Sequence, residues 1–185
     1  MGGFDAIVLA GGRARRLGGI DKPALEMDGM SMLDRALEAA SDAVRVIVVG
    51  EERPVRGSVE WVVEDPPGGG PAAALAAGMK QVGSDRVLVL AADLPFVDRS
   101  TVHRLVAAAG ARGAIAVDDA GVRQPLLAVY ETDPLRRSLD GCNQRDRALR
   151  GVIGEMDPLE VGVGRAALDC DTWDDVVRAQ VMLRG

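Results

Sequence analysis

A stretch near the N-terminus combines glycines with basic side chains, which is the composition of a phosphate-binding loop. The glycines and basic residues alternate between positions 11 and 22, namely Gly11, Gly12, Arg13, Arg15, Arg16, Gly18, Gly19 and Lys22. Glycine lets the backbone come close to a ligand, so that successive N–H groups can point at anionic oxygens. The basic side chains add mobile positive charge. We therefore expect this loop to bind the phosphates of a nucleotide.

The loop differs from the two common glycine-rich nucleotide motifs. A P-loop requires G-x-x-x-x-G-K-[ST], and the dinucleotide fingerprint requires G-x-G-x-x-G at the start of a helix. Neither string occurs between Leu9 and Pro23. A glycine-rich turn with solvated arginines is the alternative, but the apolar run Phe4–Leu9, typical of a buried strand, leads directly into the loop. The sequence thus indicates a third kind of nucleotide site.

An acidic residue after an apolar run is the second group that could do chemistry. Residues 87–92 predict a buried strand, and Asp93 stands at its carboxyl end. A lone acid at this place is often a turn former or a helix cap. Nucleoside triphosphates, however, react as magnesium complexes, and Mg²⁺ takes one or two carboxylates beside the phosphates. We therefore expect Asp93 to bind Mg²⁺.

Two more acids alternate near the C-terminus. Asp169 and Asp171 precede Thr172, which is expected to cap the last helix. Alternation places both carboxylates on the same face of an extended segment. Asp171 is thus expected to reach the metal and share it with Asp93, although helix capping alone would also explain an acid here.

The basic loop resembles the nucleotidyltransferase pattern L-A-G-G-x-x-x-R-x-G-x-D-K over Leu9–Lys22, with one extra glycine at 18–19. The form is most similar to that of the molybdenum cofactor guanylyltransferases, the MobA-like family. Further similar segments follow in the same order along the chain, at residues 64–71, 93–96, 124–130 and 169–175. The family's G-P-L-x-G segment is only partly kept, because Ala72 and Ala74 replace its leucine and second glycine.

The resemblance implies a Mg²⁺-dependent nucleotidyltransferase that transfers GMP from GTP to the phosphate of molybdopterin. It implies catalytic roles for Arg16, Lys22 and Asp93, and metal binding by Asp93 and Asp171. The implied nucleotide-binding residues are Leu9, Ala10, Gly11, Gly12, Arg13, Lys22, Gly50, Asp65, Gly70 and Asp93. Lys22 is expected to be an exposed loop side chain, and Asp93 to be unpaired in the metal-free protein.

The acids at positions 169 and 171 keep other functions open. Many guanylyltransferases of the family have asparagines there, whereas related cytidylyltransferases and sugar-nucleotide transferases have acids. The alternatives are therefore transfer from CTP to molybdopterin, or transfer to a sugar phosphate. A non-catalytic nucleotide-binding accessory protein is an alternative of another class. The presence of both Lys22 and Asp93 argues against it, since binding alone has less need of a metal carboxylate.

Size and composition limit the remaining possibilities. A chain of 185 residues fits a single transferase domain, residues 1–185, and its formal net charge of −6 argues against nucleic-acid binding. No stretch approaches eighteen apolar residues, no signal peptide is recognisable, and the two cysteines lack metal or redox spacing. We expect free thiols, no membrane contact and a cytoplasmic protein. The expected partners are GTP, molybdopterin or another phosphorylated acceptor, and other molybdenum cofactor proteins.

Strands and helices alternate along the chain and must position these residues. Strands are expected at residues 4–9, 44–49, 61–63, 87–92, 114–117 and 124–130. Helices are expected at 32 to about 40, with Ser31 as its cap, and at 72–81, about 99–111 and after Thr172. The alternation predicts an α/β fold with a mainly parallel sheet. The resemblance specifies a three-layer α/β/α domain of the nucleotide-diphospho-sugar transferase type.

Three features have no settled role. His103 lacks a nearby partner for catalysis and is expected to be an exposed helix residue. Residues 124–130 could be core or could face the second substrate. Residues 133–155 look like an interrupted helix whose arginines form either a solvated face or a second anionic subsite.

Overall fold

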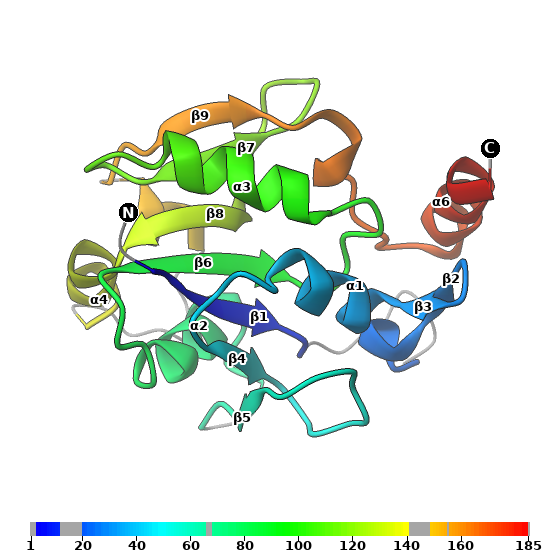
Figure 1. Ribbon diagram of the computed structural model, residues 1–185, viewed down its shortest axis with the longest axis horizontal. Coiled ribbons are helices and arrows are strands. Elements are labelled where there is room, and N and C mark those ends of the chain that lie inside the picture. Colours follow the sequence, from blue (N-terminus) through cyan, green and yellow to red (C-terminus); the bar gives the residue numbers. More distant parts are fainter. Residues whose placement is uncertain (1–2, 12–19, 66–67, 141–148, 155, 185) are drawn as a thin grey trace.

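The computed structural model describes residues 3–11, 20–65, 68–140, 149–154 and 156–184 (Figure 1). In this part of the chain seven strands form one sheet in the order β5-β4-β1-β6-β8-β7-β9. They are β1 (Asp5–Leu9), β4 (Val46–Val49), β5 (Glu60–Val62), β6 (Arg86–Ala91), β7 (Ala114–Val117), β8 (Arg123–Glu131) and β9 (Leu159–Gly162). Neighbouring strands are parallel except where β8 pairs with β6 and β7. The predicted mainly parallel sheet is confirmed.

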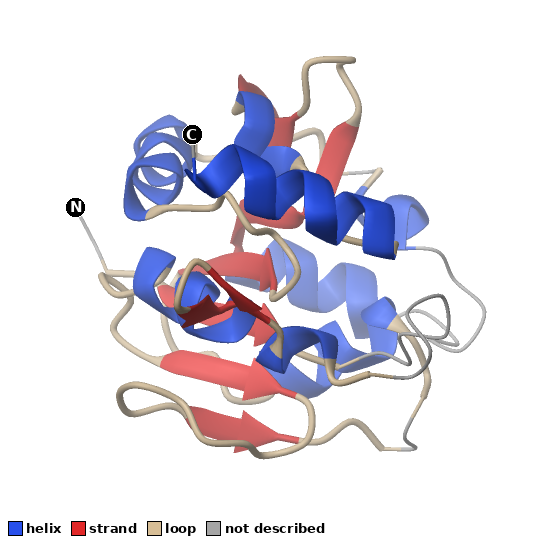
Figure 2. Ribbon diagram, turned by 90° about the vertical axis from the view of Figure 1, so that its right-hand side faces the viewer, coloured by secondary structure: helices blue, strands red, loops and turns tan. Residues whose placement is uncertain are grey.

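Helices cover both faces of the sheet (Figures 1 and 2). One layer contains α1 (Met32–Ala39) and α3 (Arg99–Ala108), which lie in front of the sheet in Figure 1. The other contains α2 (Pro71–Met79), α4 (Thr132–Asp140) and α5 (Leu149–Ile153). The predicted three-layer α/β/α arrangement is therefore confirmed.

Strand β1 shows why the apolar runs form buried strands. Successive side chains of a strand point to opposite faces, so Ala6 and Val8 pack in one layer while Ile7 and Leu9 pack in the other. Because helices cover both faces, all five residues of β1 are buried, and the four that follow Asp5 are all apolar. The buried carboxylate of Asp5 accepts hydrogen bonds from the amides of Gly83 and Ser84 at 2.8 and 3.1 Å.

Helix α6 (Trp173–Arg184) packs against a small hairpin of β2 (Glu26–Met27) and β3 (Met30–Ser31) at one side of the sheet (Figure 1). The predicted cap of this helix is confirmed. The Asp175 amide donates to Thr172 Oγ1 at 3.2 Å, and the Thr172 amide donates to the Asp175 carboxylate at 2.9 Å. This reciprocal capping fixes the start of α6 and the segment before it.

Other expectations about the elements are confirmed or extended. Ser31 caps α1 by accepting a hydrogen bond from the Asp34 amide at 3.0 Å. Strand β9 and the short 3-10 helix Gly164–Ala167 were not predicted. Cys170 is a free, buried cysteine, whereas Cys142 lies outside the described residues. In the described residues no helix has both the length and the apolar character that crossing a membrane requires.

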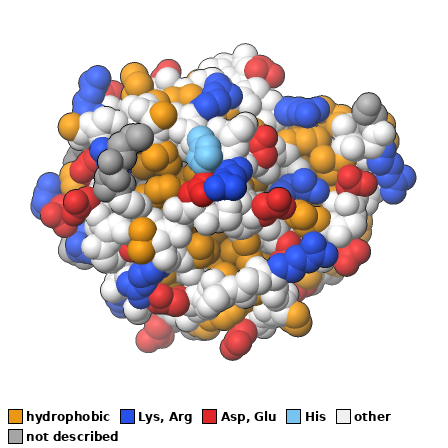
Figure 3. Space-filling view, viewed as in Figure 1, with side chains coloured by type: hydrophobic (Ala, Val, Ile, Leu, Met, Phe, Trp, Pro, Cys, Tyr) orange, Lys and Arg blue, Asp and Glu red, His pale blue; other side chains and the backbone are white. Residues whose placement is uncertain are grey.

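A charged cluster joins the turn after α1 to α3. Asp42 accepts hydrogen bonds from Arg99 and from the side chain of His103. His103 is 57% exposed on α3, as predicted for an exposed helix residue (Figure 3). The hydrogen bonds from Arg99 and His103 lower the pKa of the Asp42 carboxyl to about 2. The carboxylate therefore stabilises the fold above its unfolded pKa of 3.8, and this contribution is lost as the pH falls through about 2.

Replacing Asp42 by asparagine should consequently lower the urea midpoint of unfolding slightly at pH 7. The difference from the parent protein should shrink as the pH falls from about 4 towards 2, because the parent carboxylate then becomes protonated. Urea titrations at three pH values measure this directly. A difference that grows on acidification would contradict the assignment.

Candidate active site

The carboxyl ends of β1, β4 and β6 lie next to one another at one edge of the sheet. The Ala10 amide donates to the Val49 carbonyl at 2.9 Å, and the Ala92 amide donates to the Leu9 carbonyl at 3.0 Å. Open α/β sheets bind their ligands at this edge. Three of the predicted site residues, Gly11, Gly50 and Asp93, lie within two residues of the ends of these strands.

The ammonium group of Lys22 bridges two carboxylates at this edge. Its Nζ atom lies 2.8 Å from Asp93 Oδ2 and 3.0 Å from Asp171 Oδ1. Burial by itself lowers the pKa of Lys22, but the attraction and hydrogen bonds of Asp93 and Asp171 outweigh it and raise the pKa. The structure therefore brings together three residues that lie 71 and 149 positions apart.

Two expectations about this cluster are wrong. The Lys22 side chain is only 12% exposed, because the two acids draw it onto the sheet edge, so it is not a free loop lysine. Asp93 is likewise not an unpaired acid, since Lys22 neutralises it. The metal-free site is thus an ion-paired group rather than a set of repelling carboxylates.

Each member of the cluster is placed by a different element. Asp93 follows β6, and Lys22 begins a short 3-10 helix, η2 (Lys22–Ala24), whose Pro23 is buried. Asp171 lies in the segment before α6. That segment is attached to the turn after β6, because the Cys170 amide donates to the Asp93 carbonyl at 3.2 Å.

Asp169 brings a third acid close to the pair. Burial raises the pKa of its carboxyl, and the charges of Asp171 and Asp93 raise it further. Asp169 and Asp171 interact because they alternate along an extended segment and so lie on the same side of it, as the sequence predicted. Negative potential is therefore concentrated around the Lys22 ammonium.

The carboxylates of Asp93 and Asp171 fit the ligand preferences of Mg²⁺. Both contact a single nitrogen atom, so the two acids already share one cation, the Lys22 ammonium group. Mg²⁺ usually takes one or two carboxylates and completes its octahedron with water and substrate phosphates. Among the described residues no group of three or more His, Cys, Asp or Glu side chains is arranged to hold a metal. Two carboxylates are enough for a metal that is bound together with a triphosphate.

Gly50 lies against the backbone at the start of the basic loop. A Cβ atom at this position would meet the Ala10 carbonyl oxygen at 2.9 Å and the Gly11 nitrogen at 3.2 Å, and the residue has φ of 153°. Such contacts are too close for a real side chain. Gly50 therefore allows β4 to end beside Ala10 and Gly11.

We expect Gly50→Ala to displace the Ala10–Gly11 backbone and lower kcat/KM by about tenfold or more, with a loss of about 1–3 kcal/mol in the free energy of unfolding. Steady-state kinetics and urea titration measure the two effects. Gly162→Ala is the matched control, because a Cβ there would meet nothing within 4 Å. Equal activity of the two variants would show that the Gly50 contact does not position the loop.

Arg53 is a residue of this edge that the sequence did not single out. Its Nη1 atom donates to the Ala10 carbonyl at 3.2 Å, and Nε and Nη2 each lie 3.0 Å from an oxygen of the Asp21 carboxylate. The side chain is only 15% exposed. The stretch after β4 carries no motif, so local sequence could not reveal a role that depends on residues 10 and 21.

Comparison with known proteins identifies the family. The model of the MobA-like NTP transferase domain matches residues 6–159. The chain belongs to this family. Two curated relatives, the molybdenum cofactor guanylyltransferases of Shewanella sp. (strain MR-4) and Shewanella loihica, are 34% and 33% identical over 142 residues, which cover 74% of this chain and 72% of each relative.

Solved structures with the same fold include other nucleotidyltransferases. Molybdopterin-guanine dinucleotide biosynthesis protein A from Archaeoglobus fulgidus has a TM-score of 0.74 at 22% identity, over 98% of this MobA-like chain and 99% of that protein. The 2-C-methyl-D-erythritol 4-phosphate cytidylyltransferase from Thermus thermophilus has a TM-score of 0.71 at 20% identity, over 97% and 98%. The predicted fold of the nucleotide-diphospho-sugar transferase type is confirmed.

The other predicted site residues of the MobA-like chain have different surroundings. Gly12, Arg13 and Arg16 lie outside the described residues. Leu9 packs in the core, where its carbonyl accepts the Ala92 amide. Asp65 is exposed, and Gly70, with φ of 86°, stands at the start of α2. Among the described residues, neither Asp65 nor Gly70 has a hydrogen bond or ion pair with Lys22, Asp93 or Asp171.

The structure partly settles the roles of residues 124–130 and 133–155, which the sequence left open. Residues 127–130 are fully buried, and the Tyr130 hydroxyl donates to the Pro125 carbonyl at 3.0 Å, so this part of the segment is core. The arginines at 145 and 147 lie outside the described residues, as does the side chain of Arg150. A second anionic subsite there stays a prediction.

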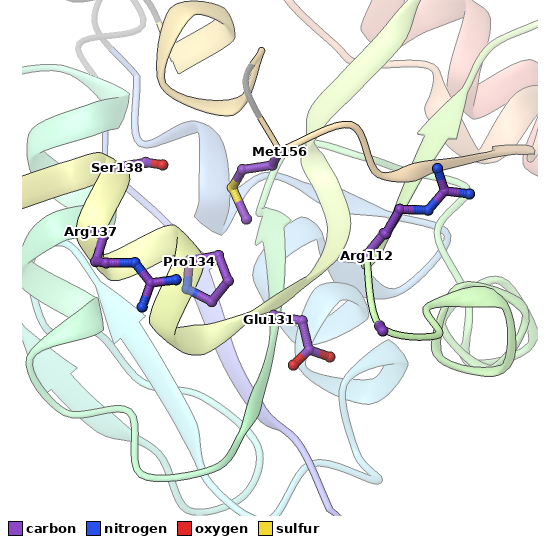
Figure 4. A pocket seen from close by; sticks show the side chains of 7 residues that line it. Arg112, Glu131, Pro134, Arg137, Ser138 and Met156 are labelled. Atoms are coloured by element: carbon purple, nitrogen blue, oxygen red, sulfur yellow. The ribbon is translucent and has the colours of Figure 1, made fainter.

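A pocket of about 450 Å³ lies elsewhere on the MobA-like domain (Figure 4). Its lining includes Arg112, Glu131, Arg137 and Met156. Glu131 pairs with Arg86, the first residue of β6, whereas Asp93 follows the last residue of that strand. The pocket is therefore at the opposite edge of the sheet and is not part of the candidate active site.

Proposed function

We propose that this MobA-like domain transfers GMP from GTP to the phosphate of molybdopterin and releases pyrophosphate. The curated relatives that are 34% identical over 142 aligned residues are named molybdenum cofactor guanylyltransferases. The observation that carries the proposal is the joining of Lys22, Asp93 and Asp171 at the carboxyl edge of the sheet. An ammonium group and two carboxylates meet there, and Lys22 is itself the last residue of the loop predicted to bind phosphate.

The proposed reaction is a single in-line displacement. A phosphate oxygen of the acceptor forms a bond to the α-phosphorus of GTP, while the bond from that phosphorus to the bridging oxygen of the β-phosphate breaks. Pyrophosphate leaves with the electron pair of the broken bond. The acceptor phosphate is already ionised, so neither a general base nor a covalent enzyme intermediate is required. The protein's contribution is positioning and the stabilisation of negative charge.

Lys22 is proposed to donate to phosphate oxygens of the bound triphosphate, together with Arg16 and the amides of Gly11 and Gly12. Asp93 and Asp171 would hold Mg²⁺, which would supply positive charge to offset the negative charge of the triphosphate and of the leaving pyrophosphate. In the nucleotide-free protein Lys22 supplies the positive charge between the same carboxylates. Arg13 is proposed to add charge on the loop side. Both acids thereby have a cationic partner before the substrate binds.

Glu64 offers a physical basis for a preference for guanine. It stands after β5, and its Oε1 atom accepts the Gly68 amide at 2.6 Å. Oε2 is buried and, within the described part of the chain, lacks a hydrogen-bond partner. A buried carboxylate oxygen needs a donor. Guanine presents two adjacent N–H donors, at N1 and N2, whereas adenine and cytosine do not offer this pair.

Glu64→Gln is therefore expected to reduce the preference for GTP over ATP and CTP by about tenfold, since a charge-assisted hydrogen bond is replaced by a neutral one. Competition between the triphosphates in the transfer assay measures the preference. Asp65→Asn is the matched control, because Asp65 is the exposed neighbour. An unchanged preference in Glu64→Gln together with a lost preference in Asp65→Asn would assign base recognition to Asp65 instead.

A cytidylyltransferase is the second candidate, and the acids at positions 169 and 171 favour it. Pyrophosphate release with each of the four triphosphates, with and without molybdopterin, separates the candidates. Guanylyl transfer predicts release only with GTP, acceptor and Mg²⁺ together. Preferred use of CTP would make the protein a cytidylyltransferase, and binding of GTP without release under any condition would make it an accessory protein.

A further inference from the structure

We infer that Arg53 is a positioning residue, which ties Ala10 to Asp21 across the base of the basic loop and thereby sets the position of Lys22. The inference rests on the proposed function of this loop as the triphosphate site. Arg53 would act through Asp21 rather than by touching the substrate. Nothing in the reaction itself requires an arginine at this place.

The contacts of Arg53 span the loop at its two ends. The guanidinium donates to the Ala10 carbonyl at 3.2 Å, directly after β1, and through Nε to the Asp21 carboxylate at 3.0 Å, while Nη2 lies 3.0 Å from the other Asp21 oxygen. A bidentate pair between arginine and a carboxylate fixes orientation as well as distance. The side chain is mostly buried, so water competes little for these hydrogen bonds. Arg53 therefore fixes the separation between Ala10, where the chain enters the loop, and Asp21, where it leaves the loop.

The position of Asp21 is passed on to Lys22. The Asp21 carbonyl accepts the Ala24 amide at 3.1 Å, and the Lys22 carbonyl accepts the Leu25 amide at 3.1 Å, so η2 begins from this point. Lys22 Nζ then reaches Asp93 and Asp171. Displacement of Asp21 would move the first residue of η2, and the ammonium group with it.

Arg53 also removes an electrostatic obstacle. Asp21 is half exposed and stands next to the lysine proposed to bind phosphate. Without Arg53 its carboxylate would be an uncompensated negative charge beside a ligand that carries several negative charges. Repulsion between like charges at this range weakens anion binding. Arg53 thus contributes both position and charge compensation, each through Asp21.

Arg45 provides a matched control at the other end of the same strand. It precedes β4 and contacts a carboxylate in the same way, with Nε and Nη2 at 2.8 and 2.6 Å from the two oxygens of Glu60. Its Nη1 atom also donates to a backbone carbonyl, that of Gln81, at 2.6 Å. Arg45→Ala removes the same kinds of hydrogen bond as Arg53→Ala, but far from the loop.

The test measures binding of inorganic tripolyphosphate by calorimetry, because this probe needs neither guanine nor an acceptor. Arg53→Ala should bind it about tenfold or more weakly than the parent, whereas Arg45→Ala should stay within about twofold. Amide exchange at Ala24 and Leu25 should also accelerate in Arg53→Ala alone. Binding by Arg53→Ala within about twofold of the parent would overturn the inference.

Two further variants test the route through Asp21. Arg53→Lys keeps the charge without the fork, so it should bind tripolyphosphate more weakly than the parent but more tightly than Arg53→Ala; parental binding would contradict the positioning role. In an Asp21→Asn background, Arg53→Ala should weaken binding by less than about threefold, since the carboxylate that Arg53 compensates is gone. The same loss in both backgrounds would mean that Arg53 does not act through Asp21.

These measurements are separable from the proposed function. A parent protein that binds tripolyphosphate with the expected dependence on Arg53 but transfers no GMP would refute guanylyl transfer and support the loop assignment. If the parent and Arg53→Ala transfer GMP equally well, guanylyl transfer would be supported and the positioning role of Arg53 would be refuted. Arg53→Lys and Asp21→Asn provide the comparison if Arg53→Ala does not fold, which thermal unfolding will show.

Discussion

Asp93→Asn is expected to lower Mg²⁺-dependent transfer by about a thousandfold or more while the protein stays folded. Asparagine keeps the shape and one acceptor oxygen but removes the charge that holds the metal. Nucleotide should still bind weakly through the basic loop. The free energy of unfolding should fall by about 1 kcal/mol or less, because the lost ion pair with Lys22 is partly exposed to solvent. Steady-state kinetics over a range of Mg²⁺ concentrations, with thermal unfolding, measure both effects.

Asp171→Asn is the matched control for the metal site, since Asp171 contacts the same ammonium group. A comparable collapse of activity would mean that the two acids share the ion. Near-normal activity would give Asp171 a structural or acceptor-side role. Full Mg²⁺-dependent turnover of Asp93→Asn would show that the proposed metal site is wrong.

Lys22→Met should lower kcat/KM by about a hundredfold or more, because a donor to the triphosphate is lost. The same change should increase the affinity of the nucleotide-free protein for a divalent cation. Lys22 supplies the positive charge between Asp93 and Asp171, so its removal leaves two carboxylates that attract a cation more strongly. Mn²⁺ binding, followed by electron paramagnetic resonance, should therefore be several-fold tighter in the variant.

The opposite signs make this prediction specific. A variant that is merely misfolded would lose both activity and cation binding. Lys80→Met is the control, because Lys80 is an exposed lysine at the end of α2. Weaker or unchanged Mn²⁺ binding by Lys22→Met would mean that Lys22 does not compete for the carboxylates.

Local sequence patterns were enough to predict most of the fold. The β-branched and apolar runs that became β1, β4 and β6 are continuous because helices cover both faces of the sheet. The caps at Ser31 and Thr172 were recognisable because each involves residues only three positions apart. Strand β9 was missed since it is short, and three of its four residues are exposed at the sheet edge.

The sequence predicted that Lys22, Asp93 and Asp171 belong to one site, but it did not predict how their side chains are arranged. The motif placed Lys22 on the loop and Asp93 after a strand, yet it could not show that they form an ion pair. That contact depends on the path of the chain before α6, where the Cys170 amide binds the Asp93 carbonyl. The role of Arg53 could not be predicted for the same reason, because its partners Ala10 and Asp21 are 43 and 32 positions away in the sequence.

Transfer of the α-phosphorus is the measurement that tests guanylyl transfer most directly. The purified protein is incubated with molybdopterin, Mg²⁺ and GTP labelled at the α-phosphorus, and the products are separated. Guanylyl transfer predicts the label in a molybdopterin guanine dinucleotide, with one pyrophosphate released for each dinucleotide formed. Label that stays in GTP, or that appears only as free GMP, would contradict it.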